Sequence, residues 1–281
     1  MADNFNNKAT DNVASKNIVT ENAVMENVFN INNLSFAYDK QKVLDGLNVT
    51  FAKGKVTTLI GANGCGKSTL FNLCTKNLKP QEGSIKLGGT DIEAMKLKDY
   101  AKKVAIVHQY NTAPADITVK KLVEYGRTPY MTFGISKDTK LDEERVRFAL
   151  DITNTYKHRD KPVAELSGGQ KQRVWIAMAL AQDTGILFLD EPTTYLDIRY
   201  QLEILQLIRK LNREYGMTII MVLHDINQSL YYSDEIAAMK DGHIIAKGNP
   251  SEVITDKLIE QVYGVKLNVT QVDGKPYVLT V

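Results

Sequence analysis

The sequence predicts an α/β fold built on a mostly parallel β-sheet covered on both faces, with an antiparallel β-layer added near the start of the chain. Two patterns carry this prediction. Short β-like runs dominate residues 28–60, and after residue 100 apolar strands alternate with helical segments. The 281 residues are 43% hydrophobic and 24% charged, which is enough apolar material for one large domain or two small ones.

The first part of the chain is predicted to consist mainly of strands. Its apolar runs are short and are separated by Gly46, Gly54 and a turn at Asp39-Lys40, as expected of neighbouring strands. A short helix is predicted for Thr69–Cys74. The runs predicted as strands are Val28–Ile31, Leu34–Tyr38, Val43–Leu44, Leu47–Phe51, Val56–Ile60 and Ile85–Leu87.

The second part is predicted to alternate buried strands with helices. Continuous apolar runs predict strands at Lys103–His108, Gly185–Leu189 and Met217–Leu223. Apolar residues at helical spacing predict helices at Val119–Tyr125, Leu141–Ile152, Arg173–Gln182 and Ile198–Tyr215, the last of which ends at Gly216. A final helix is expected from an N-cap at Ser251 to about Tyr263, followed by a hairpin that turns at Asp273-Gly274.

Composition excludes several classes of protein. Lys and Arg number 35 against 33 Asp and Glu, so the net charge of +2 excludes a nucleic-acid binder that works by bulk charge. No apolar stretch is long enough to span a bilayer, and the N-terminus lacks a signal-peptide core. Two cysteines, Cys65 and Cys74, make neither a disulfide framework nor a zinc site. We therefore expect a cytosolic protein without a membrane span of its own.

Residues 1–24 differ from the rest of the chain. They are rich in Asn and small polar residues with scattered apolar side chains, so they cannot bury enough surface to offset their ordering entropy. We expect this tail to be disordered and residues 25–281 to be folded. Met25 is a candidate alternative start, and the tail is either dispensable or an arm that binds a partner.

A glycine-rich run, Gly61–Thr69, follows the predicted strand Val56–Ile60 and precedes a predicted helix. It fits the G-x-x-x-x-G-K-[ST] pattern of a phosphate-binding loop, whose backbone N–H groups and helix N-terminus surround a phosphate. Lys67 can neutralise the β- and γ-phosphates, and Ser68 can bind Mg²⁺. The candidate phosphate-binding residues are Gly61, Asn63, Gly64, Cys65, Gly66, Lys67, Ser68 and Thr69.

Two acids follow the buried strand that ends in Ile186–Leu189. The carboxyl end of a strand is where an α/β sheet presents its ligand-binding residues. Asp190 is a candidate Mg²⁺ ligand, and Glu191 is placed to polarise a water for attack on the γ-phosphate. Alone, two acids at a strand end are more often a solvated terminus; together with the glycine-rich loop they indicate nucleotide hydrolysis.

Leu166–Gln170 opens the apolar helix of the second part. Ser167 is a natural N-cap, and Gly168 and Gly169 leave the helix N–H groups accessible, which makes a second phosphate-binding site. An ordinary capped helix is the alternative. Two phosphate sites in one chain suggest a nucleotide site shared between two chains, to which Ser167, Gly168, Gly169 and Gln170 contribute.

In these motifs the sequence resembles the ATP-binding cassette (ABC) ATPases over about residues 27–281. Gly61–Thr69 matches the Walker A motif, Ile186–Glu191 matches Walker B, and Leu166–Gln170 matches the signature. The resemblance implies a RecA-like P-loop core, an antiparallel β-subdomain, a helical subdomain at about residues 110–175, and a C-terminal helix and hairpin at about residues 251–281. Other matching positions are Gln109 of the Q-loop, His224 of the switch, Tyr195-Leu196-Asp197 of the D-loop, and Tyr38 as the residue that stacks on adenine.

The resemblance also implies roles and cofactors. ATP and Mg²⁺ are the expected cofactors, and the family works as a head-to-tail dimer with one ATP between the P-loop of one subunit and the signature of the other. Glu191, His224, Gln109 and Lys67 are the expected catalytic residues. Ser68, Gln109 and Asp190 are the expected metal ligands. Tyr38 and Asp197 join the phosphate-loop and signature residues in the expected ATP site.

A single cassette without membrane spans is similar to the ATPase subunit of a bacterial importer. Lys67 and Ser167 lie 100 residues apart, which leaves no room for the insertions of DNA-repair members. Three segments, Val174–Gln182, Thr193–Ile198 and Tyr125–Tyr130, look like those of ferric siderophore import ATPases. This resemblance implies a peripheral protein on the cytoplasmic face of the membrane. Its partners would be a dimeric membrane permease and, indirectly, an extracytoplasmic iron-chelate-binding protein, with no nucleic acid.

Three alternatives stay open. Cobalamin and haem import ATPases share much of the same sequence. A non-transport ABC ATPase, regulatory or associated with DNA, would have no permease. A P-loop kinase or GTPase would not need Leu166–Gln170, and the chain has no N-K-x-D segment for guanine.

Overall fold

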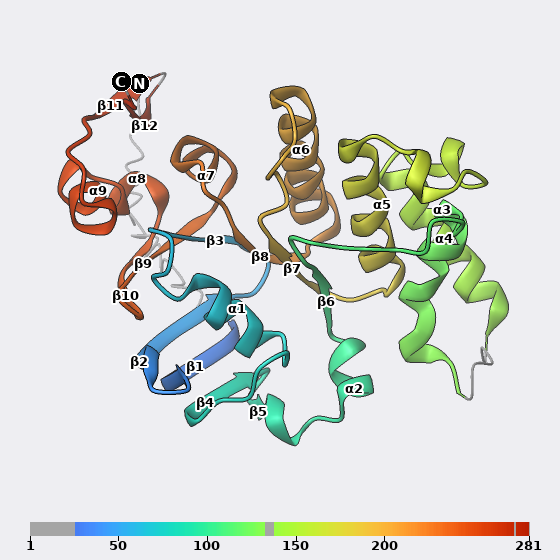
Figure 1. The fold of residues 1–281 in the computed structure, drawn as a ribbon, viewed down its shortest axis with the longest axis horizontal. Helices are drawn as coiled ribbons and strands as arrows, with labels where there is room; N and C mark the ends of the chain where they lie inside the picture. The colour runs from blue at the N-terminus through green and yellow to red at the C-terminus, as the bar shows by residue number, and fades with distance from the viewer. Residues whose placement is uncertain (1–25, 133–137, 273, 281) are drawn as a thin grey trace, which may run out of the picture.

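The computed structural model describes residues 26–132, 138–272 and 274–280, and a six-stranded sheet forms its centre (Figure 1). The tail at 1–24 and Asp273 of the expected hairpin turn lie outside the described residues. The strand order is β10-β9-β3-β8-β7-β6, with β9, β3, β8, β7 and β6 parallel and β10 antiparallel to β9. These strands span β3 Val56–Gly61, β6 Val104–Val107, β7 Ile186–Asp190, β8 Thr218–Val222, β9 Glu235–Lys240 and β10 His243–Gly248.

The parallel strands put the predicted motifs at one edge of the sheet. The phosphate loop follows β3, Gln109 lies just beyond β6, Glu191 follows β7, and His224 lies just beyond β8. Because the carboxyl ends of parallel strands meet at one edge, residues far apart in sequence come together there.

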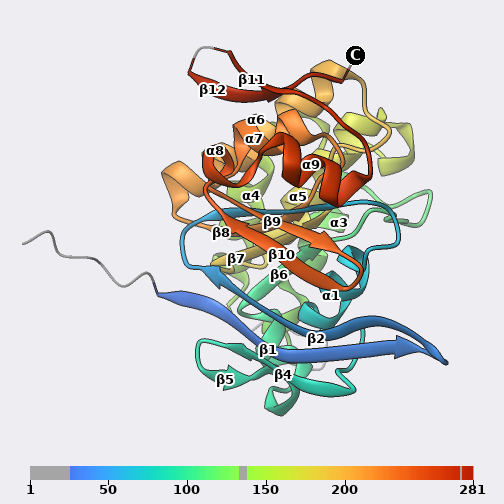
Figure 2. The same ribbon diagram turned by 90° about the vertical axis from the view of Figure 1, so that its left-hand side faces the viewer.

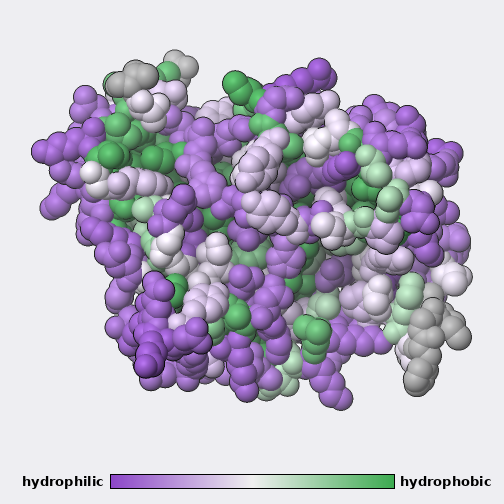
Figure 3. All heavy atoms as spheres, in the orientation of Figure 1, coloured by the Kyte–Doolittle hydropathy of each residue, from purple (hydrophilic) through white to green (hydrophobic). Residues whose placement is uncertain are grey.

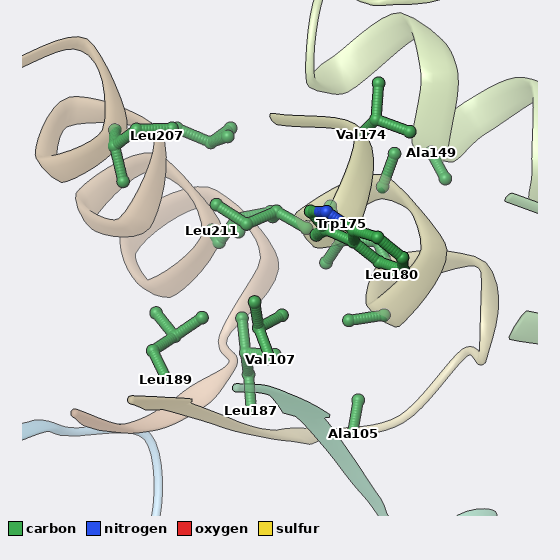
Figure 4. Close-up of a cluster of buried hydrophobic side chains, with 14 of the residues drawn as sticks. Ala105, Val107, Ala149, Val174, Trp175, Leu180, Leu187, Leu189, Leu207 and Leu211 are labelled. Atoms are coloured by element: carbon green, nitrogen blue, oxygen red, sulfur yellow. The ribbon is translucent and has the colours of Figure 1, made fainter. Parts of the chain in front are cut away.

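Helices cover one face of this sheet. The apolar faces of α5 (Gly168–Ala181), α6 (Ile198–Tyr215) and α3 (Val119–Glu124) pack on the inward side chains of β6, β7 and β8. Trp175 is 9% exposed and lies within this cluster (Figure 4). Asp197 is the N-cap of α6, and Gly216 is its C-cap, in the left-handed conformation that glycine adopts readily.

A second sheet and α1 (Lys67–Cys74) cover the opposite face (Figure 2). This antiparallel layer has the order β2-β1-β4-β5. The two runs predicted at 28–31 and 34–38 form one long strand, β1, and those at 43–44 and 47–51 form another, β2. Shifts in the register of this pair, one of them beside Gly46, let each strand continue. The strands span β1 Asn27–Tyr38, β2 Gln41–Ala52, β4 Glu82–Leu87 and β5 Thr90–Asp91; a 3₁₀ helix at Ile92–Ala94 and α2 (Leu97–Ala101) follow.

Residues 117–132 and 138–181 form a helical group at one end of the molecule (Figure 1). It contains α3, α4 (Thr139–Ile152) and α5, with 3₁₀ helices at Tyr125–Tyr130, Tyr156–His158 and Val163–Glu165. Arg127, 1% exposed, connects its parts: its Nε lies 2.7 Å from Asp142 Oδ1, and Nη1 donates to the Ala181 carbonyl at 2.7 Å.

The C-terminal part corrects one prediction. The expected single helix from Ser251 to Tyr263 is wrong: Asn249 caps α8 (Pro250–Val253), and Thr255 caps a separate α9 (Asp256–Tyr263). Asn249 and Thr255 each accept a backbone N–H of the following turn, so the chain starts a helix twice. The strands β11 (Val269–Val272) and β12 (Lys275–Val278) pair antiparallel, as the expected hairpin requires. The helix α7 (Ile226–Tyr232) and strands β9 and β10 were not predicted. None of the described helices is long and apolar enough to cross a membrane.

Candidate functional site

The glycine-rich loop connects β3 to α1, as its pattern predicts. Gly61 has a φ of +154°, and a Cβ there would lie 2.5 Å from the Met239 carbonyl oxygen and 2.6 Å from Cys65 Sγ. A side chain at this position is therefore excluded by the packing of β9 against the loop. Gly66 has a φ of +105° where the loop enters α1. The loop keeps Asn63, Gly64 and Ser68 exposed, whereas Cys65, Lys67 and Thr69 are buried.

Lys67 is folded back into its own loop. Its Nζ donates to the carbonyl oxygens of Gly61 at 2.7 Å and Ala62 at 3.0 Å, and the residue is 5% exposed. Cys65 Sγ lies 3.9 Å from the same Nζ. The ammonium is thus held where the loop backbone turns, which is where the positive charge of such a loop meets a phosphate.

Glu191 is the centre of the predicted catalytic group. Its Oε1 lies 2.5 Å from His224 Nε2, and its Oε2 accepts from Gln109 Nε2 at 2.5 Å. Thr194 Oγ1 donates to the same Oε2 at 3.1 Å. The Glu191 side chain is 11% exposed, whereas that of His224 is 45% exposed. Three of the four residues expected to be catalytic are therefore in direct contact.

Asp190, one residue earlier, tests whether a cation fits here. Its Oδ1 is buried and has no hydrogen-bond partner among the described residues. Burial, and then the nearby charge of Glu191, raise the pKa of Asp190 to about 6. A hard divalent cation prefers carboxylate and hydroxyl oxygens, and it would stabilise the charged form that this environment disfavours. The donor set of Asp190, Gln109 and Ser68 fits Mg²⁺.

The signature segment is not part of this cluster within the chain. Ser167 Oγ accepts from Gln170 N at 3.4 Å, and Gln170 Oε1 accepts from Ser167 N at 3.0 Å, so the two form a capping box at the start of α5. The signature helix α5 packs on α3, α4, α6 and β6, whereas α1 packs on β2, β3 and β7. Gly168 is exposed at the helix start, while Gly169 lies against the ring of Tyr200.

The remaining predicted residues lie outside the Glu191 group. Tyr38 ends β1 with its ring 47% exposed, which leaves it available for stacking. Asp197 caps α6 by accepting from Tyr200 N at 3.1 Å. Sequence reasoning missed Thr194, which follows Glu191 in a Thr-Thr pair that carries no signal of its own. It also missed the hydrogen bond between the hydroxyls of Tyr110 and Tyr195, 3.0 Å apart, which connects the segments that follow Gln109 and Glu191.

Comparisons with known proteins show the family of the chain. The family model described as ABC transporter matches residues 44–194. The petrobactin import ATP-binding protein FpuC of Bacillus anthracis is 43% identical over 250 residues, which cover 89% of this chain and 92% of that protein. The iron(3+)-hydroxamate import ATP-binding protein FhuC of Bacillus subtilis is 45% identical over 230 residues, or 82% of this chain and 85% of that protein.

A solved structure has a similar fold. The dimeric post-hydrolysis structure of the ATP-binding cassette MJ0796 with ADP and Pi aligns with a TM-score of 0.69 at 27% identity, covering 79% of this chain and 98% of that one. The RecA-like core and the antiparallel β-layer are therefore those of an ABC cassette. The chain belongs to the ABC transporter family and is an ATP-hydrolysing cassette.

Proposed function

We propose that this chain is the ATPase subunit that energises an importer of iron–siderophore complexes. The observation that carries the proposal is the similarity along most of the chain to two ATPases named for iron-chelate import. Those relatives are named for different chelates, petrobactin and an iron(3+)-hydroxamate, so the proposal extends to the class of cargo and not to one siderophore.

In this proposal the chain's own residues carry out hydrolysis. Glu191 accepts a proton from the water that attacks the γ-phosphate, and the ADP–phosphate bond breaks as the new bond to the water oxygen forms. Gln109 contacts one carboxylate oxygen of Glu191 and His224 contacts the other, which supports this role because the two contacts fix the orientation of the carboxylate. Lys67 and the loop N–H groups hold the β- and γ-phosphates, and Tyr38 stacks on the adenine.

Ser68, Gln109 and Asp190 would hold Mg²⁺ beside the phosphates. When bound, the cation neutralises phosphate charge and so lowers the barrier to attack by an electron-rich oxygen. The buried, partnerless Oδ1 of Asp190 supports this assignment within the described part of the chain.

We further propose that two copies share each ATP, held by the P-loop of one and by Ser167, Gly168, Gly169, Gln170 and Asp197 of the other. Two observations support the dimer. The signature and the P-loop belong to separately packed helices of one chain, and the related MJ0796 cassette is described as a dimer. The permease would dock between the Q-loop and the helical subdomain, in the region around Gln109 and residues 110–165, on the cytoplasmic face of the membrane. An extracytoplasmic protein would deliver the chelate to the permease.

Uptake of radio-iron bound to a panel of siderophores tests the proposal. Cells that lack this protein and its redundant ATPases are complemented with wild type or Lys67→Ala. Wild type should restore uptake of some chelates, and Lys67→Ala should not. If neither restores iron uptake, the siderophore assignment is wrong, and cobalamin and haem are tested next in the same cells. If Lys67→Ala restored uptake as well as wild type does, ATP hydrolysis would not be required for the function.

A further inference from the structure

The C-terminal hairpin is attached to the helix that begins two residues after His224. Asn227, in the first turn of α7, pairs with Val278 of β12 through both of its amide atoms. Asn227 Nδ2 donates to the Val278 carbonyl at 3.0 Å, and Val278 N donates to Asn227 Oδ1 at 2.8 Å. A side-chain amide that both donates and accepts reproduces one rung of a β-ladder, so the strand is fixed to the helix in one register.

Apolar packing holds the same contact in place. Val278 is fully buried in a cluster with β3 and α9, and Ile226 and Leu230 of α7 pack against that cluster. Lys275 of the hairpin lies over the ring of Tyr231 at 4.1 Å. Figure 3 shows apolar side chains gathered at the upper left, where Figure 1 places the hairpin above α8 and α9. The hairpin is therefore an integral support of α7.

The start of α7 determines where His224 lies. Asp225 is the N-cap: its Oδ1 accepts from Gln228 N at 2.8 Å, and its carbonyl accepts from Ser229 Oγ at 2.8 Å. His224 directly precedes this cap, and 45% of its side chain is exposed. Packing constrains such an exposed side chain only weakly. The 2.5 Å contact of His224 with Glu191 therefore depends on the position of the His224 backbone, which the start of α7 fixes.

A second support holds α7 from the opposite direction. Gln228 Nε2 donates to Gln201 Oε1 at 2.7 Å, and Gln201 Nε2 donates to the Leu196 carbonyl at 2.9 Å. These bonds connect α7 to α6 and to the segment that follows Glu191. The helix is thus held between the hairpin and α6, and its first turn carries His224 toward the carboxylate.

We propose that the C-terminal hairpin positions His224 for ATP hydrolysis and that Asn227 is the positioning residue through which it acts. The inference rests on the proposed role of His224 in hydrolysis. Asn227 itself touches no reacting atom: it holds the helix, the helix holds the backbone of His224, and His224 orients Glu191. If the hairpin served stability alone, its loss would reduce the amount of folded protein without acting through His224.

The test compares Asn227→Ala with Asp256→Ala in the full-length protein, by steady-state ATP hydrolysis with MgATP. Asp256 is the matched control, because its Oδ1 accepts from Val269 N at 2.6 Å and so ties the other hairpin strand to α9 instead of α7. We expect Asn227→Ala to lower kcat about threefold to tenfold, the range for losing one well-placed contact. The KM for ATP should stay unchanged, because the P-loop is not involved. Asp256→Ala should retain the wild-type kcat.

A double-mutant cycle with His224→Ala separates positioning from stability. If Asn227 acts through His224, Asn227→Ala has no further effect once His224 is gone. The same loss in both backgrounds, or an equal loss of kcat in Asp256→Ala, overturns the inference. If His224→Ala alone leaves kcat unchanged, the proposed role of His224 fails first, and this result is distinct from a failure of Asn227 to couple.

Deuterium exchange gives a second readout that does not need turnover. Asn227→Ala should raise exchange in peptides covering residues 223–232, whereas Asp256→Ala should raise it only in β11 and α9. Where His224→Ala reduces hydrolysis below detection, this comparison decides. Equal exchange at residues 223–232 in wild type and Asn227→Ala overturns the inference.

Discussion

Glu191 Oε1 and His224 Nε2 lie 2.5 Å apart although the two residues follow different strands. The register of the sheet explains the contact. The strands β7 and β8 are adjacent and parallel, and Asp190 of one is opposite Val222 of the other. Glu191 and His224 are the first polar residues beyond this pair, so both leave the sheet at the same level. The carboxylate is then held from a second direction by Gln109, which follows β6 on the other side of β7.

Replacement of Glu191 by Gln should separate ATP binding from hydrolysis. The amide keeps the size of the side chain but cannot accept the proton of the attacking water, so we expect hydrolysis to fall by about 100-fold or more. ATP binding should persist, and the variant should form an ATP-dependent dimer, measured by light scattering after size exclusion. The exposed Glu93→Gln is the control and should behave as wild type. Near-normal hydrolysis in Glu191→Gln would show that Glu191 is not the base. If the variant stayed monomeric with ATP, even in the presence of the permease, the shared ATP site would be contradicted.

Mixing two inactive variants tests the shared site in another way. Lys67→Ala should lose phosphate binding in its own P-loop, and Ser167→Arg should block the signature by placing a bulky cation at the start of α5. In a head-to-tail dimer, the mixed pair contains one site with both an intact P-loop and an intact signature. The mixture should therefore form a nucleotide-containing dimer that neither variant forms alone. Light scattering measures the dimer, and radiolabelled ATP measures the nucleotide that it retains. If each site belonged to one chain, mixing would restore nothing.

Local sequence patterns place several of the candidate site residues at the ends of strands and helices. The phosphate loop, the acids after β7 and the capping box of α5 depend on local geometry, because a strand, a loop and a helix N-terminus follow one another within a few residues. Gln109 and His224 each follow an apolar run, and the parallel sheet brings them to Glu191. Their places were therefore predictable once the strands were identified.

What the sequence analysis missed has both local and long-range causes. The strands β9 and β10 are joined by Asp241-Gly242, a hairpin signal that the sequence analysis did not use. The helix α7 is too short to be identified from its pattern alone. The supposed helix from Ser251 was divided because Thr255 supplies a second N-cap inside a run of helical spacing. Thr194 and Tyr110 have no motif: Thr194 contacts Glu191 from only three residues away, whereas the tertiary structure brings the Tyr110 hydroxyl to that of Tyr195.

The buried guanidinium of Arg127 should contribute strongly to stability. Replacement by Leu removes its 2.7 Å contacts with Asp142 and the Ala181 carbonyl, and its stacking 4.0 Å above Tyr130. Removing one partner of a buried ion pair costs about 3 kcal/mol of unfolding free energy. Urea denaturation measures the change. Arg199→Leu is the matched control, because its ion pair with Glu203 is on the surface, where screening by solvent leaves it contributing far less to stability. Equal effects of the two substitutions would contradict the structural role of Arg127.

The histidine beside the signature should make stability depend on pH. Burial, and then the charges of Lys157 and Lys161, hold the pKa of His158 below its usual value. The folded protein therefore binds fewer protons at this site than the unfolded chain, so stability should fall as the pH drops from about 6.5 through the lowered pKa. Urea denaturation between pH 5 and 8 (a range set by the ordinary histidine pKa) should show wild type losing stability relative to His158→Gln on the acid side.

The structural reason for this direction lies at the capping box. His158 Nε2 lies 3.4 Å from Gln170 Nε2, which is a donor, so the neutral ring can accept this contact and the protonated ring cannot. In this tautomer the proton of the neutral ring is on Nδ1, which is buried without a partner among the described residues, so the second proton of the charged ring would be on Nε2 and would face the Gln170 N–H. The exposed His243→Gln serves as the control for removing a histidine. A stability difference between wild type and His158→Gln that stays constant across the range would show that the ring does not titrate against the signature.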